Sequence, residues 1–259
     1  MNEMDTETLS RAKDLSEKIA AACGVPLFYR EQRDRVDASC RMLETNPLVL
    51  ECIGILTARE SSSGHGLAHA RKVARDAGAI ILIERSSSAE TNRLTTLAQV
   101  AGILHDIERS RKDHARRGAE TAGAILAEFE LTETERKAVT DAIRNHEAFH
   151  SFSPLADPDA QLLSDTLYDA DKFRWGPDNF TEMIWDIAET RKIPMRTLLS
   201  YFHPGLQSLT KIRESFRTSA GKRYGPDFID LGFRIGNTLY EKLGKEYLPE
   251  SPPNHGQAR

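Results

Sequence analysis

The sequence predicts an all-α protein, and three observations support this fold class. First, apolar residues recur at intervals of three and four along most of the chain, which is the spacing of one face of an α-helix. Second, short turn signals separate these stretches, and no linker rich in glycine or proline divides them. Third, the one β-branched run, residues 79–83, stays in helical phase with the residues before it. We therefore expect a multi-helix bundle without strands.

The N-terminal part is expected to form three helices. The first covers residues 6–23, where apolar residues share one face, and the glycine and proline of residues 24–26 end it. The next two cover residues 31–43 and 47–57, because a Thr-Asn-Pro turn at residues 45–47 separates two apolar periodic stretches.

The same signals divide the rest of the chain. A small, polar loop at residues 61–66 leads into a helix at residues 67–84, and three serines at residues 86–88 precede a helix at residues 91–107. The later helices are expected at residues 114–129, 133–147, 159–173, 179–191, 194–201, 205–218 and 226–247.

The expected helices form one domain over residues 1–248. Its parts are N-terminal helices at residues 1–60, a central block at residues 61–175 and C-terminal helices at residues 176–248. The tail, residues 249–259, is polar and rich in proline, and we expect it to be disordered.

Composition narrows the class of protein. The formal net charge of −4 argues against a general nucleic-acid binder, which would carry a basic surplus. No apolar run approaches the roughly 20 residues that a membrane-spanning helix needs, and the acidic, polar start does not resemble a secretory signal. The cysteines, Cys23, Cys40 and Cys52, form no CxxC pair and are expected to be reduced thiols. We therefore expect a cytoplasmic protein with neither a nucleic-acid nor a membrane partner.

Several polar side chains occupy positions where the helical pattern calls for apolar residues. His105 continues the apolar face of Leu97, Ala101 and Leu104, and Asp106 follows it directly. A buried carboxylate costs several kcal/mol unless something offsets it, and a cation is the usual offset. Three other helices carry a histidine or an aspartate on their apolar stripe, and a fourth begins with a histidine. The whole set is His69, His105, Asp106, His114, His146 and Asp171.

A metal site explains this set better than isolated core histidines do. A single histidine on an apolar face is usually a hydrogen-bonded core residue. Imidazoles and carboxylates that converge from several helices are, by contrast, a common way to build a metal site in a bundle. Imidazole and carboxylate ligands without thiolate suit one or two divalent transition-metal ions: Mn, Fe, Co, Ni or Zn.

The order and surroundings of these residues resemble the HD superfamily of metal-dependent phosphohydrolases. That family carries a histidine on one helix, a His-Asp doublet on a later helix and a distant aspartate. The matching residues are His69 in HARKV, the doublet His105–Asp106 in AGILHDI, and Asp171 in DADKF. The resemblance spans residues 64–175 and implies an HD-type bundle with N- and C-terminal helical extensions.

The resemblance also implies a binuclear site. His114 and His146 match the extra histidine pair of binuclear family members. In such members the doublet aspartate, here Asp106, bridges two metal ions. Two cations about 3.5–4 Å apart acidify a bridging water and clamp phosphate oxygens. The implied function is therefore hydrolysis of a phosphate ester or anhydride of a small molecule by a metal-activated hydroxide. Similar flanks in bacterial HD-type diadenosine tetraphosphate hydrolases point to a nucleotide.

Four further residues are candidates for catalysis or substrate binding. Lys172 follows Asp171 and could stabilise charge or protonate the leaving group. Arg109 stands three residues after Asp106, where several family members carry an acidic residue, and its guanidinium favours phosphate binding. Lys112 belongs to a basic cluster beside the doublet, together with Arg109, Arg111, Arg116 and Arg117. The alternative interpretation of this cluster is a solvated surface. His65, one helical turn before His69, resembles an upstream histidine of some small HD hydrolases. The alternative interpretation is that His65 lies in a loop and has no role in the site.

Two other functions use the same residues. Some HD proteins with a six-ligand set hold two irons and activate oxygen, and the ligands alone do not separate them from hydrolases. A non-catalytic signalling module on an HD-like scaffold is the third alternative. Such modules usually lose ligands, whereas this sequence keeps all six.

Overall fold

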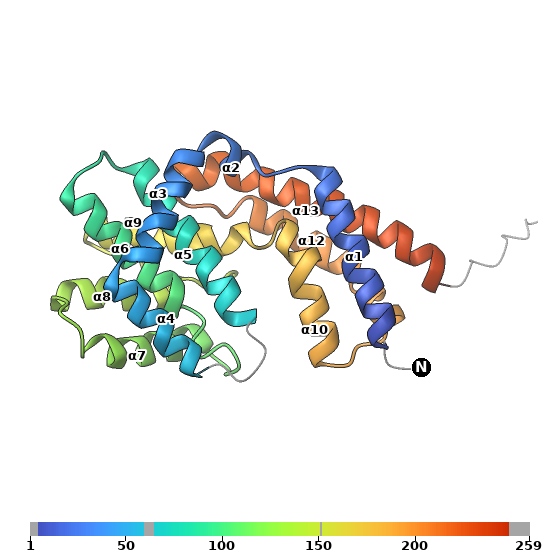
Figure 1. Cartoon of the computed structure of the whole chain (residues 1–259), viewed down its shortest axis with the longest axis horizontal. Coiled ribbons are helices and arrows are strands. Elements are labelled where there is room, and N and C mark those ends of the chain that lie inside the picture. Colours follow the sequence, from blue (N-terminus) through green and yellow to red (C-terminus); the bar gives the residue numbers. More distant parts are fainter. Residues whose placement is uncertain (1–4, 60–64, 151, 249–259) are drawn as a thin grey trace, which may run out of the picture. The chain divides into compact units, whose positions relative to one another are not determined.

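The computed structural model describes residues 5–59, 65–150 and 152–248, except for the side chain of His65. The predicted tail at residues 249–259 and most of the predicted loop at residues 61–66 therefore lie outside the described residues. Within them the chain is helical and contains no strand, which confirms the all-α prediction (Figure 1). The helices are α1 (Thr6–Cys23), α2 (Leu27–Glu31), α3 (Arg33–Thr45), α4 (Pro47–Arg59), α5 (His65–Glu84), α6 (Ala89–Leu104), α7 (His114–Leu126), α8 (Glu133–Arg144), α9 (Pro158–Phe173), the π-helical turn η1 (Asn179–Met183), α10 (Ile184–Thr190), α11 (Met195–Ser200), α12 (Phe202–Arg213) and α13 (Ser219–Tyr247).

The helices group into two compact units. The core unit contains Val25–Trp175 and Ile212–Phe228, and so it includes the predicted central block at residues 61–175. The second unit contains α1, the residues Gly176–Lys211 and the part of α13 from Ile229. The domain limits expected from the sequence, residues 1–248, stay a prediction.

Helices α5 and α6 pack closely at the centre of the core unit. A Cβ atom on Gly102 of α6 would lie 2.5 Å from the Cα atom of Ala74 on α5, so no larger residue fits there. Every residue of α6 from Leu94 to Leu104 is buried, because neighbouring helices cover it on all sides. A side chain at the end of α6 therefore enters the interior of the unit.

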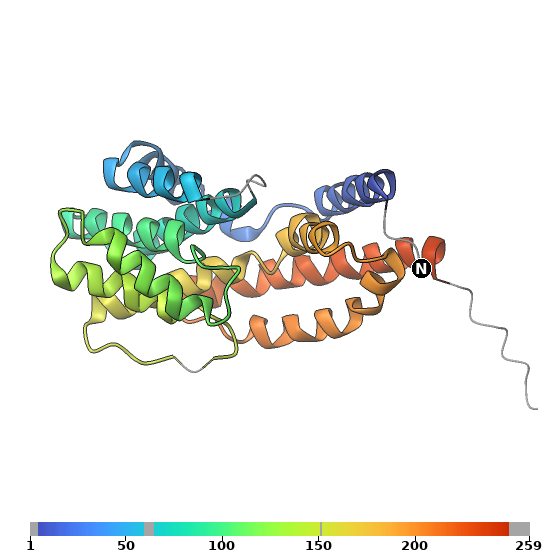
Figure 2. The same cartoon turned by 90° about the horizontal axis from the view of Figure 1, so that it is seen from below.

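The other core helices surround this pair. Helices α7 and α8 lie side by side, and α8 also packs against α6 and α9 (Figure 2). A capping box starts α8: Thr132 Oγ1 accepts from Glu135 N, and Glu135 accepts from Thr132 N at 2.8 Å. Asp157 caps α9 by accepting a hydrogen bond from Ala160 N. These caps fix where both helices begin.

Three helices near the candidate site end earlier than the apolar pattern predicts. The helix expected at residues 91–107 ends at Leu104, that expected at 114–129 ends at Leu126, and that expected at 133–147 ends at Arg144. After Leu104 the chain continues in turns closed by hydrogen bonds between residues three apart. One of these bonds runs from Ile107 N to Leu104 O at 3.1 Å. His105, Asp106 and His146 therefore lie just beyond helices rather than inside them.

The C-terminal helices also differ from the prediction. The helix expected at residues 205–218 is α12, Phe202–Arg213, and the helix expected from residue 226 begins seven residues earlier, at Ser219. Pro226 lies inside α13, where it lacks one backbone donor, and this is why the sequence pattern placed it at a helix start. Gly225 permits the Phe216 ring to approach the helix, because a Cβ there would lie 2.3 Å from it.

The second unit has an aromatic core of its own. Trp185 is fully buried and donates hydrogen bonds to Phe180 O at 2.8 Å and to Ser16 Oγ at 3.1 Å. Nowhere in the described parts of the chain is a helix long and apolar enough to cross a membrane.

Candidate metal centre

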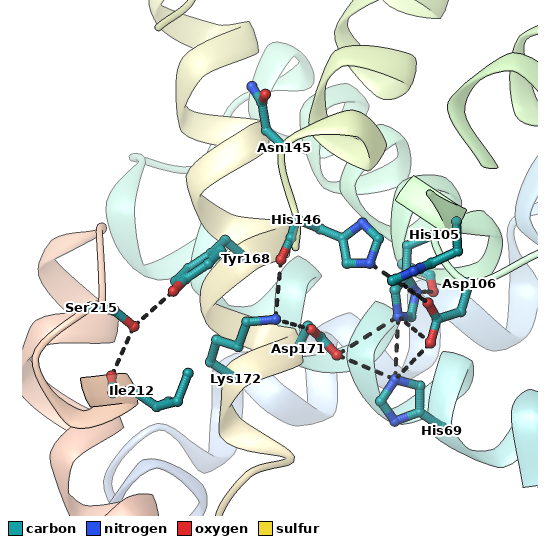
Figure 3. Close-up of polar contacts among 12 residues, drawn as sticks. His69, His105, Asp106, Asn145, His146, Tyr168, Asp171, Lys172, Ile212 and Ser215 are labelled. Carbon is teal, nitrogen blue, oxygen red and sulfur yellow. Dashed lines mark hydrogen bonds and ion pairs between the residues drawn. The ribbon is translucent and has the colours of Figure 1, made fainter. Parts of the chain in front are cut away.

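All six predicted donor side chains belong to the core unit, and five helices bring them together. His69 comes from α5, and His105 and Asp106 follow α6 directly. His114 begins α7, His146 follows the end of α8, and Asp171 lies in the last turn of α9. In Figure 3 the side chains of His69, His105, Asp106 and Asp171 point toward one another, and His146 approaches Asp106 from the other side.

The first donor group consists of His69 Nε2, His105 Nε2, Asp106 Oδ2 and Asp171 Oδ1. The two histidine nitrogens are 3.2 Å apart, and His69 Nε2 lies 3.3 Å from Asp171 Oδ1. Asp106 Oδ2 lies 3.5 Å from His105 Nε2 and 3.9 Å from His69 Nε2. A metal ion about 2.0–2.2 Å from each ligand places neighbouring ligand atoms roughly 3.0–3.5 Å apart. The first donor group is thus close to the spacing of one coordination sphere.

The second donor group consists of Asp106 Oδ1, His114 Nε2 and His146 Nε2. Asp106 Oδ1 lies 3.7 Å from His114 Nε2 and 3.6 Å from His146 Nε2, and the two imidazole centroids are 5.3 Å apart. The donor atoms of His69, His105 and Asp106 lie within 4.8 Å of one another, and so do those of Asp106, His114 and His146. Asp171 joins the first group through its contacts with His69 and His105, at 3.3 and 3.7 Å. The two oxygens of one carboxylate, Asp106, therefore face two different pairs of histidines.

Backbone carbonyls orient two of the imidazoles. His105 Nδ1 donates to Gly102 O at 2.8 Å, and His146 Nδ1 donates to Ile143 O at 2.6 Å. Because a carbonyl only accepts, these bonds fix the proton on Nδ1 and leave the Nε2 lone pair directed at the donor group. Gly102 and Ile143 were not among the residues predicted for the site. Their position three residues before each histidine is the signal that could have identified them.

One carboxylate oxygen of the donor groups lacks the hydrogen-bond partner that burial demands. Asp106 Oδ1 is buried and has no hydrogen-bond partner among the described residues. A cation would satisfy this oxygen, so the donor set fits a bound metal ion. Burial opposes ionisation of Asp106, but the surrounding histidines and Arg109 outweigh it and hold its pKa below the ordinary value. Burial is likewise outweighed at Asp171, chiefly by the charge of Lys172, which lowers the pKa of that carboxyl. Both carboxyls are therefore ready-made anionic ligands.

Burial favours the neutral form, which metal ligands require, at two of the histidines, His105 and His114. Burial lowers the pKa of His105 to about 4. Burial is also the largest influence on His114, and it lowers the pKa of that imidazole. At neutral pH both therefore present a lone pair, and a metal ion would displace no proton from them.

Lys172 lies behind the first donor group. Its side chain is only 4% exposed, and its Nζ pairs with Asp171 Oδ2 and donates to His146 O at 3.1 Å (Figure 3). One ammonium therefore holds a carboxylate of the first group and the backbone of a ligand of the second. These contacts are those of a residue that positions ligands, and its predicted catalytic role stays a prediction.

The three predicted substrate-binding residues are placed differently. Arg109 is at the donor groups: its Nη1 lies 3.5 Å from Asp106 Oδ2 and 3.5 Å from His114 Nε2, while 63% of its side chain is exposed. Lys112 is exposed on the segment between α6 and α7, and no contact joins it to the described donor atoms. The side chain of His65 lies outside the described residues. Glu108 is withdrawn from the site, because Thr121 Oγ1 donates to it at 3.0 Å.

No protein-family model, curated protein or solved structure matches this chain. The all-helical fold and the two donor groups are compatible with an HD-type domain.

Proposed function

We propose that this protein is a metal-dependent phosphohydrolase that cleaves a phosphate ester or anhydride of a small molecule, namely a nucleotide. The proposal depends on one observation: the two carboxylate oxygens of Asp106 face different histidines. Its Oδ2 faces His105 and its Oδ1 faces His146, at 3.5 and 3.6 Å. A carboxylate shared in this way suits two neighbouring divalent ions, which is the arrangement used for phosphoryl transfer to water.

The residues of the chain have separate parts in this proposal. One ion would be held by His69, His105, Asp106 and Asp171, and the other by Asp106, His114 and His146. Bound divalent ions supply Lewis acidity, which acidifies water and neutralises phosphate oxygens. Asp106 keeps both sites on one rigid group, and Lys172 holds Asp171 in place.

Arg109 would bind the substrate phosphate. Its guanidinium lies at Asp106 and His114, yet most of the side chain remains exposed. A planar guanidinium offers parallel donors that match two oxygens of a phosphate. We expect Arg109→Ala to raise the KM for a phosphorylated substrate, with the metal content of the protein unchanged.

The test is metal analysis of the purified protein together with a phosphate-release screen over nucleotides with Mn, Co, Ni and Fe. We expect the wild type to release phosphate only when a metal ion is present, and we expect Asp106→Asn to abolish this release. The matched control is Asp113→Asn, because Asp113 is an exposed aspartate on the same segment and makes no side-chain cap. Iron-dependent oxygen consumption without phosphate release would replace the proposal by the oxygenase alternative.

A further inference from the structure

We propose that Phe149 and Trp175 form a stacking surface for the base of a nucleoside phosphate whose phosphate lies at Arg109 and the two donor groups. This inference deepens the proposed function and rests on it for the position of the phosphate. It assigns the aromatic part of the substrate to residues outside the donor set.

Phe149 is held outward at a conformational cost. Its side chain is among the most exposed large apolar side chains of the described chain, at 60%. Its backbone has a φ of 65°, in the left-handed region, which costs an L-residue roughly 1–2 kcal/mol. Neither the exposure nor the strain helps folding. An exposed ring held in a strained conformation is a reason to look for a ligand.

Trp175 supports the ring of Phe149 from the side. The two ring centroids are 6.2 Å apart and the ring planes are inclined by 86°, so the contact is edge-to-face. This geometry is a favourable one for aromatic pairs, and it leaves the flat surface of one ring uncovered by the other. A planar base can therefore stack on that surface.

Both aromatic residues are tied to metal-ligand segments. Phe149 comes three residues after His146, and Trp175 comes four residues after Asp171. Trp175 N donates to Lys172 O at 3.0 Å, and Lys172 Nζ lies 6.0 Å from a ring centroid of Trp175. Because the same Nζ contacts Asp171 and His146, the aromatic pair lies next to the donor groups.

The segment that carries Phe149 is anchored on both sides. Asn145 Nδ2 donates to Ser153 O at 3.2 Å, which ties the two ends of the segment together. The guanidinium carbon of Arg217 lies 4.1 Å from the ring centroid of Phe152 and 3.6 Å from that of Tyr168. These contacts fix residues on either side of Phe149, namely Asn145 before it and Phe152 after it.

A nucleoside phosphate matches the charges and rings at the site. Glu147, two residues before Phe149, directly follows His146 of the second donor group, so the chain that leads to Phe149 starts at that group. Arg109 lies at His114 of the same group, 3.5 Å from its Nε2. In this proposal a ligand that joins an anionic phosphate to a flat ring through one sugar would contact Arg109 with its phosphate and Phe149 with its base. A phosphorylated sugar without a base would contact Arg109 but not the ring of Phe149.

The experiment compares adenosine 5′-monophosphate with ribose 5-phosphate. Binding of each is measured by calorimetry to the wild type, to Phe149→Ala and to Tyr201→Ala, which removes an equally exposed ring of the second unit. Stacking of a base on an aromatic side chain is worth about 1–3 kcal/mol, or roughly 5- to 150-fold in affinity. We expect Phe149→Ala to lower the affinity for adenosine 5′-monophosphate by this factor and to leave the affinity for ribose 5-phosphate unchanged. Tyr201→Ala should change neither.

Three results would overturn the inference: an equal loss of affinity for both ligands in Phe149→Ala, no loss of affinity for either, or no binding of adenosine 5′-monophosphate to the wild type.

Tryptophan fluorescence provides a second readout. A bound base should quench Trp175, and the quenching should persist in Trp185→Phe, which removes the other tryptophan. Binding does not require turnover. A protein that binds the nucleotide through Phe149 but releases no phosphate with any metal would refute the proposed hydrolase and support the stacking surface.

Discussion

Asp106 offers its two oxygens to different histidine pairs, and this makes the two donor groups separable. The first group retains His69, His105, Asp106 and Asp171 when His114 and His146 are removed, because none of its atoms comes from the second pair. A change confined to one pair should therefore affect one ion.

The double substitution His114→Ala and His146→Ala is expected to lower the metal content from two ions per chain to one. Phosphate release should fall steeply, because water activation loses one of its two cations. Metal analysis of the folded variant measures the stoichiometry, and His150→Ala with His203→Ala serves as the control, since both of those histidines are exposed. An unchanged metal content in the first double variant would show that His114 and His146 bind something other than metal.

Lys172→Met is expected to destabilise the protein by about 3 kcal/mol or more, because it leaves the buried carboxylate of Asp171 without its cation. The matched control is Lys137→Met. Lys137 also pairs with an aspartate, Asp141, but its side chain is 71% exposed, and such a pair contributes about 1 kcal/mol or less. Urea unfolding of the metal-free proteins measures both. Equal effects of the two substitutions would contradict the role of Lys172 as a buried partner.

The sequence predicted the donor residues but not the contacts that hold them. His69, His105 and Asp171 could be found because each places a polar group on an otherwise apolar helical face. The bond from Lys172 to His146 O joins residues 26 apart, and it depends on how α8 packs against α9. No local pattern reports such packing.

At the scale of elements, the starts of α6, α7 and α8 are better predicted than their ends. The expected start at residue 133 coincides with α8, because Thr132 and Glu135 form a capping box that depends only on neighbouring residues. The expected end of the helix before the site is three residues too late, because His105 continues the apolar spacing although the helix ends at Leu104. A polar side chain that enters the interior just after a helix ends keeps the spacing of the buried face, so the spacing alone does not mark the helix end.

The α8 cap leads to a pH prediction. The hydrogen bonds from Arg93 lower the pKa of Glu135 from its ordinary value of 4.5 to about 2. A carboxyl with a lowered folded pKa stabilises the protein above its unfolded pKa, and that contribution is lost as the pH falls through the folded pKa. The unfolding free energy of Glu135→Gln, relative to wild type, should therefore show a constant deficit above about pH 5.5. The deficit should shrink progressively between pH 4.5 and about pH 2.

Chemical denaturation across this pH range measures the effect. Glu133→Gln is the control, because Glu133 is an exposed glutamate in the same first turn. A deficit for Glu135→Gln that does not change with pH would show that the ionised carboxylate has no part in the cap.

At the scale of the whole molecule, a metal ion would join helices that are far apart in the chain. The donors span His69 to Asp171 and come from five helices of the core unit. Because the unfolded chain does not present them together, metal binding should stabilise the folded state.

Adding Mn²⁺ to the metal-free protein at about 100 times its Kd should stabilise it by about 2.7 kcal/mol, which corresponds to roughly 5–10 °C in Tm. Differential scanning calorimetry measures the shift. Asp106→Asn should lose most of it, and Ca²⁺ should produce little, because Ca²⁺ prefers a shell of six or more oxygens. A melting temperature indifferent to transition metals would count against the metal centre.

The close approach of α5 and α6 at Gly102 and Ala74 also bears on the order of events during protein synthesis. Both helices, with His69 and His105, leave the ribosome well before Asp171, and the segment Ile212–Phe228 that completes the core unit leaves later still. A nascent chain that ends before α9 lacks a donor of the first group. Binding of a metal ion by all four donors of the first group would therefore follow the synthesis of α9.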